Sequence, residues 1–387
     1  MKEMIQAGAD WLILAQTQDE KQGQDANNIG YTYRSFVGAI RNEYKSSGCK
    51  WAYYGIHWHS MQAAIALLGV YKLMGTRKYY EGAVRAGEFL IAQQIKEGED
   101  AGLIITEGKQ GDEMIHSVAA LAESLPGLYY LYEVTGEERW KESLIGAADW
   151  IARKSYINCE GRYKDIYDYR RGRFITDEKI VGASPIRPLI DEGGMLLAYK
   201  VSGKERFREV FFGLANRLLK DENPPGNWIS YTPNSKSIGF IHARHAWWWG
   251  YPMADAFEET QEEKYFECFK RACDWYVWAQ NVDGGMHYST YIDRNKMSFG
   301  LCSSAVGCAL IMWKRYKEMT GENRYDEPAN KGIEYLRKVQ LLDVEDGNLR
   351  GAFFESIGPN NNSDRLEIYL RDLASIFAIR GLLSWME

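Results

Sequence analysis

Hydrophobic and polar positions along this chain follow two helical patterns that alternate from one end to the other. In the first pattern apolar residues recur at spacings of three and four between polar ones, which is typical of an amphipathic helix with one wet face. The second pattern is apolar nearly all round and rich in small residues, as at 63–68 (AAIALL). Such a helix is expected to be packed on both sides. The alternation predicts helical pairs with one member of each kind.

A short turn phrase separates the second pattern from the first. It joins an aromatic residue to a turn, Ser-Gly or Thr-Gly in three of the copies, and then to a second aromatic residue, and its copies lie about sixty residues apart. That spacing accommodates two helices and two connections. Each copy therefore predicts the turn of one helical hairpin. The copies lie at 71–79, 132–140, 199–207 and 316–325, with a less complete one at 257–265.

The apolar helices are predicted to form an inner ring and the amphipathic helices an outer ring. The amphipathic helices end in a similar phrase, such as Ala147-Ala148-Asp149-Trp150-Ile151. Gly8-Ala9-Asp10-Trp11-Leu12 carries the same phrase near the start of the chain, so an outer helix comes first and an inner helix comes last. The whole chain, 1–387, is therefore expected to be one all-α domain, an (α/α)6 toroid closed by its own two ends. The predicted inner helices span about 58–71, 115–132, 190–199, 243–257, 303–316 and 373–385.

Long connections run from each outer helix to the next inner helix. Asp-Gly turns within them favour short strands, which we expect at 286–291 and 349–354. All of these loops lie at the end of the toroid where the inner helices begin. We therefore expect the functional site at this mouth. The connections span about 98–113, 155–187, 221–240, 281–299 and 341–368.

Composition narrows the classes of function. A net charge of −6 argues against broad binding to nucleic acid or anionic membranes, and no apolar run is long enough to span a membrane. Without an apolar leader at the start, the simplest expectation is a cytoplasmic protein, monomeric or homodimeric. The six cysteines are scattered, so reduced thiols are expected and neither a metal nor a cofactor is predicted. Aromatic residues make up 14% of the chain, either filling a wide core or paving a cleft for sugar rings.

Asp191 and Glu192 open one inner helix and are the first candidates for chemistry. Asp191 is either a helix-capping carboxylate or a general acid or base whose pKa is raised by its surroundings. Adjacent residues on a helix diverge by about 100°, so we expect one of the two to work and the other to anchor.

The other candidates also cluster at predicted inner-helix starts. Arg244 stands beside several tryptophans, where it suits a carboxylate clamp as well as a surface salt bridge. A metal-binding role for His57 and His59 has no completing ligands, so hydrogen bonding to sugar hydroxyls is favoured. The predicted catalytic residues are Asp191, His59, Glu113 and His245. The predicted substrate-binding residues are Arg244, His57, Trp58, Tyr54, His116, Glu192, His242, Trp247, Trp248, Tyr288 and Asp372.

The recurring Tyr-Lys-x-Ser/Thr-Gly hairpins resemble those of the six-hairpin glycosidases. More narrowly, Ile190-Asp191 before the phrase LLAYKVSG, and His242-Ala243-Arg244 with Trp247, resemble motifs of unsaturated glucuronyl and rhamnogalacturonyl hydrolases. The resemblance implies that Asp191 protonates the C4–C5 double bond of the substrate and activates water, with Arg244 near the uronate carboxylate. The family's second aspartate has no equivalent at the expected helix starts, where His57, His59, Glu113 and His116 stand instead.

Three functions remain open at this point. The first is a glycoside hydrolase that acts on acidic oligosaccharides with Asp191 as general acid or base. The second is a polysaccharide lyase or uronate epimerase with histidine or tyrosine as the base, and the third is a noncatalytic sugar-binding toroid. The Asp-x-Asp-Asp motif of protonating terpene cyclases is missing, and so is the adjacent Cys-His pair of lanthionine cyclases.

Overall fold

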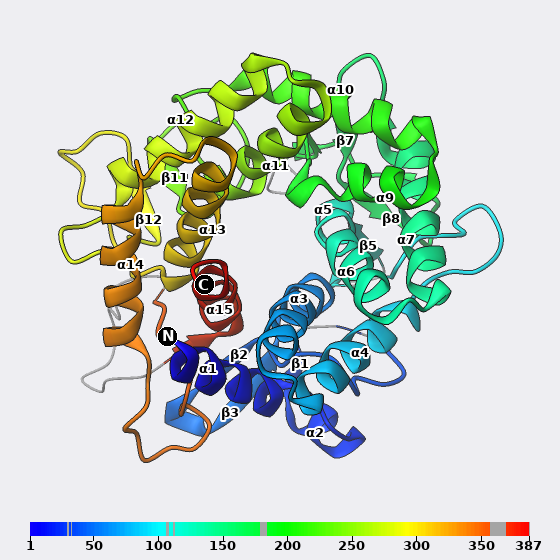
Figure 1. The fold of residues 1–387 in the computed structure, drawn as a ribbon. Coiled ribbons are helices and arrows are strands. Elements are labelled where there is room, and N and C mark those ends of the chain that lie inside the picture. Colours follow the sequence, from blue (N-terminus) through cyan, green and yellow to red (C-terminus); the bar gives the residue numbers. More distant parts are fainter. Residues whose placement is uncertain are drawn as a thin grey trace.

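A computed structural model describes residues 1–28, 31, 33–105, 108–110, 113–178, 184–356 and 369–386. Its helices form two concentric rings (Figure 1). The inner ring consists of α3 (Ile56–Met74), α6 (Leu125–Thr135), α9 (Gly194–Ser202), α11 (His245–Thr260), α13 (Ser303–Thr320) and α15 (Asp372–Ser384). The outer ring consists of α1 (Lys2–Ala15), α4 (Arg77–Ile91), α7 (Glu138–Trp150), α10 (Glu205–Asp221), α12 (Glu263–Ala279) and α14 (Asp326–Val339). The (α/α)6 prediction is confirmed.

The turn phrase works as a helix stop. In four copies the glycine of the phrase adopts a left-handed conformation, and its N–H bonds back to the last turn of the inner helix, which satisfies a carbonyl left free at the helix end. In the less complete copy Gln261 takes this place with a φ of 59°. The four glycines are Gly75, Gly136, Gly203 and Gly321.

The ring closes through its two ends, as predicted. Helices α1 and α15 lie side by side (Figure 1), and they approach closely at Gly8, where a Cβ would lie 3.1 Å from the Ile379 side chain. The Gln340 side chain, just after α14, donates to the carbonyl of Met4 at 2.8 Å. Side-chain packing and hydrogen bonds thus take the place of the covalent turn in the last hairpin.

Six loop glycines repeat one contact around the ring. Each has a positive φ and lies against the backbone of the following outer helix, where a Cβ would come within 2.0–2.3 Å of a carbonyl oxygen. The sixth contact joins Gly351 to Ala7 and so closes the circle. Only glycine fits a position that combines this φ with so close an approach. The pairs are Gly38 with Arg85, Gly102 with Gly146, Gly161 with Gly213, Gly226 with Arg271, Gly284 with Lys331, and Gly351 with Ala7.

Gly351→Ala is expected to lower the free energy of unfolding by about 2 kcal/mol, because the new Cβ both strains the backbone and pushes α1 away. The measurement is urea unfolding followed by circular dichroism. Gly347→Ala in the same loop is the matched control, since a Cβ there meets nothing within 4 Å. Equal stability of the two variants would contradict this account of ring closure.

The second inner helix differs from its prediction. Its expected first residues lie in strand β5 (Glu113–Ser117), which pairs with β4 (Gly108–Gln110) and β8 (Ile166–Asp168). A short helix α5 (Val118–Ala122) follows, and α6 begins anew with Pro126 in its first turn. Proline lacks an N–H and fits the start of a helix better than its interior, so the apolar run is divided in two.

The other strands also lie in connections between outer and inner helices. The strand expected at 286–291 is found in its second half as β12 (Ser289–Tyr291), which pairs with β11 (Phe240–His242). The strand expected at 349–354 was wrong: only Phe353 makes a bridge there, because Gly351 turns the chain. The remaining strands are β1 (Asn27–Asn28), β2 (Glu43–Lys45), β3 (Lys50–Tyr53), β6 (Tyr156–Ile157), β7 (Arg162–Lys164), β9 (Arg173–Phe174), β10 (Ile186–Arg187) and β13 (Tyr369–Arg371).

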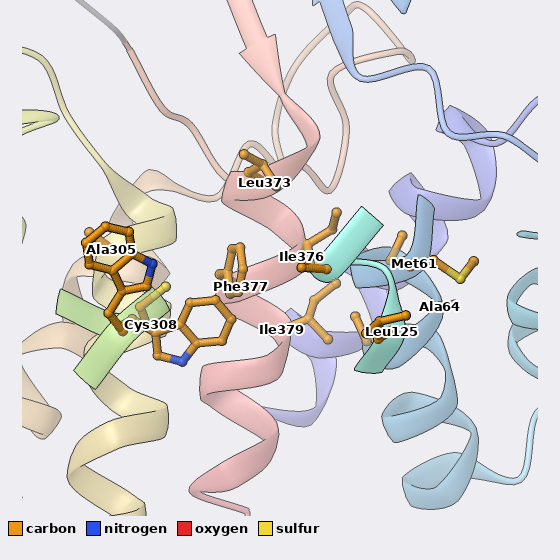
Figure 2. Packing of buried hydrophobic residues seen from close by; sticks show 14 of the residues in the cluster. Met61, Ala64, Leu125, Ala305, Cys308, Leu373, Ile376, Phe377 and Ile379 are labelled. Carbon is orange, nitrogen blue, oxygen red and sulfur yellow. The ribbon is translucent and has the colours of Figure 1, made fainter. Parts of the chain in front are cut away.

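The inner helices are packed on several sides, as their composition predicted. Figure 2 shows Ile376, Phe377 and Ile379 of α15 between Cys308 of α13 and Met61 of α3. The approach is closest between α13 and α15, where a Cβ on Gly307 would overlap the Phe377 carbonyl. All six cysteines are free thiols, as expected. Among the described helices none is both long and apolar enough to cross a membrane.

Candidate functional site

Polar and charged side chains are buried where the inner helices begin. Such burial is costly unless each group has a partner or a function. The short strands β10, β11 and β13 lead directly into these helix starts and fix the entry of the chain. The buried groups are His57, His59, Asp165, Asp191, Glu192, Asn227, His242, Arg244, His245, Ser304, Glu355, Arg371 and Asp372.

Asp191 occupies a buried turn, the 3-10 helix η3 (Asp191–Gly193), just before α9. Its Oδ2 has no hydrogen-bond partner among the described residues. Burial raises the pKa of Asp191 to about 8, and nearby Asp165 and Glu192 add to the shift while Arg187 opposes it. At neutral pH the side chain is therefore a protonated acid with one free oxygen.

Glu123 is a second carboxyl group in the electrostatic range of Asp191, and the sequence analysis did not single it out. It follows α5, at the break between α5 and α6. Burial and the charge of Asp191 hold the pKa of Glu123 well above its ordinary value, whereas Arg187 and Arg244 lower it. Both Asp191 and Arg244, the two residues that the sequence analysis singled out first, therefore lie within electrostatic range of Glu123.

Arg187 lies within electrostatic range of both carboxyl groups. Its guanidinium forms an ion pair with buried Asp165 and donates to the carbonyl of Thr232 at 3.0 Å. Asp165 also accepts from the backbone N–H of Ala119 at 2.9 Å, at the start of α5. This network ties the entry of α5 to β10 and gives the site a fixed cation.

Glu192 is bound by side chains from two inner helices. Both of its oxygens bind Arg380 of α15, at 2.7 and 3.3 Å, and Gln62 of α3 donates to it as well. Glu192 is therefore anchored, although by a left-handed turn and not by the helical divergence that was expected; that Asp191 is the working member stays a prediction.

Arg244 is buried and already paired. Its Nη1 donates to Ser304 at 2.7 Å and to Glu355 at 3.3 Å, and Glu355 also accepts from the Ser304 backbone N–H at 3.0 Å. The guanidinium lies 5.6 Å from the centre of the Trp248 ring. Arg244 is thus a fixed, compensated cation in the wall of the site and not an exposed salt-bridge residue.

His59 and Asp372 form a fully buried dyad. The Nδ1 of His59 lies 2.6 Å from Asp372 Oδ1, and Asn42 donates to the other carboxylate oxygen at 3.0 Å. With the proton on Nδ1, Nε2 carries a lone pair, and Nε2 has no partner in the described part of the chain. Burial lowers the pKa of His59 although Asp372 opposes the shift. A neutral, oriented imidazole of this kind is suited to accept a proton.

His242 and His245 are also neutral. Burial and the charge of Arg187 lower the pKa of His245 to about 3, and its Nδ1 donates to Asn227 at 3.1 Å. His242 accepts from the Arg244 backbone N–H at 3.2 Å and stacks on Trp248. His242 therefore fixes the wall, whereas Nε2 of His245 finds no partner among the described residues.

The remaining predicted residues divide between rim and core. Tyr54 is exposed, and Trp58, Trp248 and Tyr288 are half-buried, so these four aromatic side chains form the accessible rim. Trp247 packs against Phe377 at a ring-centre distance of 4.8 Å and is a core residue.

His57 is buried. Glu113 and His116 lie on strand β5, and their side chains are outside the described residues. No group of three histidine, cysteine, aspartate or glutamate residues in the described ranges is placed to hold a metal ion.

No family model and no curated protein matches the chain. Similar proteins are found only among solved structures, and their similarity is one of fold. An unsaturated glucuronyl hydrolase from Bacillus sp. GL1 has a TM-score of 0.69 at 14% identity over 99% of this chain and 96% of its own. A cellobiose 2-epimerase from Bacillus thermoamylovorans B4167 has a TM-score of 0.68 at 12% identity, over 97% of this chain and 95% of its own. This chain has the six-hairpin toroid fold.

A D-mannose isomerase adds a third kind of neighbour, with a TM-score of 0.67 at 12% identity over 99% of this chain and 96% of that one. The resemblance to six-hairpin glycosidases is thus confirmed as a likeness of fold. By their names these neighbours hydrolyse, epimerise or isomerise carbohydrates. The six-hairpin toroid alone does not select among such reactions, so the choice depends on the side chains at the mouth.

Proposed function

We propose that this protein is a carbohydrate-active enzyme that hydrolyses acidic, uronate-containing oligosaccharides, with Asp191 as the general acid. The observation that carries the proposal is the buried Asp191 carboxyl group, whose pKa is raised to about 8 and whose Oδ2 is free of described partners. A group that retains its proton at neutral pH and presents a free oxygen is equipped to protonate a substrate.

Glu123 supplies the second carboxyl group that sugar hydrolysis commonly uses. Once Asp191 has given up its proton, its carboxylate accepts a proton from the attacking water, as the resemblance to unsaturated glucuronyl hydrolases implies. Glu123 lies within reach of the charge of Asp191 and helps to orient that water. Arg187 supplies positive charge near both groups, and Arg244 supplies it near Glu123, which favours an anionic sugar over a neutral one.

A second candidate, proton abstraction from carbon by His59, is favoured by the His59–Asp372 dyad. Its free Nε2 is a positioned base, and the charges of Arg371 and Arg244 act on the same imidazole. Cations beside a base stabilise the negative charge that develops when a proton leaves a carbon next to a carboxylate or carbonyl group. This arrangement suits a uronate lyase or an epimerase.

One experiment separates these reactions. Uronate oligosaccharides with saturated and 4,5-unsaturated ends are incubated with the protein, and absorbance of the double bond is followed. Loss of absorbance indicates hydration and hydrolysis, and gain indicates a lyase. Deuterium incorporation from D2O without an absorbance change indicates an epimerase, and cellobiose and mannose serve as neutral substrates. No reaction with any acidic substrate would overturn the proposal.

His59→Gln and Asp372→Asn distinguish the two candidates by residue. If Asp191 is the acid of a hydrolase, both variants are expected to retain activity within about tenfold, because the dyad then only binds substrate. If His59 is the base, each variant is expected to lose about 10²–10⁴-fold in kcat, the usual contribution of a general base. Initial rates on the substrate identified above are the measurement, and Asp149→Asn on the outer helix α7 is the control.

A further inference from the structure

We propose that Glu192 and Arg380 form a positioning pair that holds the η3 turn and thereby presents Asp191 to the substrate. The inference rests on the proposed function, since it takes Asp191 as the proton donor. Neither residue touches the substrate in this account; each acts through Asp191.

The η3 turn has a backbone conformation that needs support. Glu192 has a φ of 49° and a ψ of 20°, and Gly193 follows with a φ of 71°. Two successive left-handed residues turn the chain sharply between Ile190 and α9. Glycine adopts this conformation readily, but a residue with a side chain does so only where its surroundings hold it. The strained backbone of Glu192 therefore requires a compensating contact, and that contact is made by the residue next to Asp191 in the sequence.

The compensating contact is a closed triangle of hydrogen bonds. Arg380 binds both oxygens of Glu192, at 2.7 and 3.3 Å. Gln62 donates its amide N–H to Glu192 and accepts from Nη1 of Arg380 with its amide oxygen. Because the three residues come from η3, α3 and α15, the triangle fixes the turn relative to two inner helices that are distant in the sequence.

Arg380 is itself held in place. Its guanidinium lies 5.3 Å from the ring centres of Trp247 on α11 and of Phe377 on α15. A planar guanidinium that stacks on aromatic rings and grips a carboxylate with two N–H groups is poorly replaced by lysine. The position of the η3 turn thus depends on the shape of the arginine side chain as well as on its charge.

The pair also acts on Asp191 through charge. Several groups face Asp191: Arg187 from β10, Asp165 after β7, Glu123 after α5, and Glu192 itself. Burial is the main cause of the raised pKa of Asp191, and the negative charges of Asp165 and Glu192 add to it. Removing the charge of Glu192 is therefore expected to lower that pKa.

The test uses Glu192→Gln and Arg380→Lys in the full chain, with Arg271→Lys as the matched control. Arg271 also grips a carboxylate with two N–H groups, that of Glu222, at 2.8 and 2.6 Å, but it lies on α12 of the outer ring. The readouts are kcat and KM across pH 5–10 on a substrate from the panel above.

Glu192→Gln is expected to lower kcat about 10–100-fold with little change in KM, and to move the alkaline limb of the kcat profile about one pH unit downward. Arg380→Lys retains the charge, so it is expected to lower kcat without moving the limb. Effects on kcat no larger than those of Arg271→Lys would overturn the positioning role. A limb that stays unmoved in Glu192→Gln would overturn the effect of the Glu192 charge on Asp191.

A measurement without substrate keeps the inference separate from the proposed function. Urea midpoints are compared for the wild type, Asp191→Asn, Glu192→Gln and the double variant at pH 5 and pH 9. The effects are expected to be additive at pH 5, where Asp191 is neutral, and non-additive at pH 9, where its charge senses Glu192. Additivity at both pH values overturns the electrostatic coupling. Coupling in a protein that turns over none of the panel would overturn the proposed function alone.

Discussion

Replacing Asp191 by asparagine is expected to abolish turnover and, at the same time, to stabilise the folded protein. The carboxyl group is buried and its pKa is raised from 3.8 to about 8. Asparagine has nearly the same shape but carries no transferable proton. Loss of a general acid typically removes about 10²–10⁴-fold from the rate, so kcat/KM is expected to fall by about 10³-fold while affinity for the substrate is retained.

The gain in stability follows from proton linkage. Between pH 4 and pH 8 the unfolded chain has released the Asp191 proton that the folded chain still holds, so the free energy of unfolding decreases as pH rises through this window. Asp191→Asn removes this decrease. At pH 8 we expect the variant to be about 1–3 kcal/mol more stable than the wild type, and at pH 4 to be nearly equal to it.

Urea unfolding at pH 4, 6 and 8 measures this effect, and Asp149→Asn on the outer helix α7 is the control. A variant that is inactive but no more stable at pH 8 would show that Asp191 is ionised in the folded protein. In the wild type, kcat/KM is expected to fall above about pH 8 as Asp191 loses its proton. An active Asp191→Asn variant would contradict the catalytic assignment altogether.

The architecture could be predicted from the sequence because the turn phrase repeats. Each glycine of the phrase is a helix stop with its own physical reason, and the apolar pattern before it marks an inner helix. The ring contact of Gly351 could not be predicted, because its partner Ala7 lies at the other end of the chain. The sequence around Gly351 does not indicate that the carbonyl oxygen of Ala7, 344 residues away, would lie 2.3 Å from a Cβ placed on this glycine.

The candidate site could be predicted from the sequence only in part. Asp191 and Arg244 stand at helix starts, where a site was expected, and the structure places both there. Glu123 was hidden within a run interpreted as one helix; Pro126, three residues later, was the signal that a new helix begins. Glu355 lies in a long connection 111 residues from Arg244. Pairing over such distances depends on tertiary packing, which local patterns do not encode.

The buried Arg244–Glu355 pair leads to the second large expected effect. Glu355→Ala leaves the Arg244 guanidinium in a site where its side chain is only 3% exposed, without a compensating charge. Removing one partner of a buried ion pair typically costs about 3–5 kcal/mol, because the remaining charge is neither solvated nor paired. Loss of the bonds from Ser304 to Glu355 adds to this cost.

A double variant, Glu355→Ala with Arg244→Met, tests the mechanism of that loss. If the cost comes from the stranded cation, removing it should restore most of the stability lost in Glu355→Ala, since replacing both charges of a buried pair is often nearly neutral. Glu81→Ala on α4 is the control, because its pair with Arg77 is exposed and contributes at most about 0.5 kcal/mol. A double variant as unstable as Glu355→Ala would show instead that packing around Ser304, and not charge, requires Glu355. Activity of the double variant on neutral and acidic sugars then reports directly whether the positive charge of Arg244 is needed for an anionic substrate.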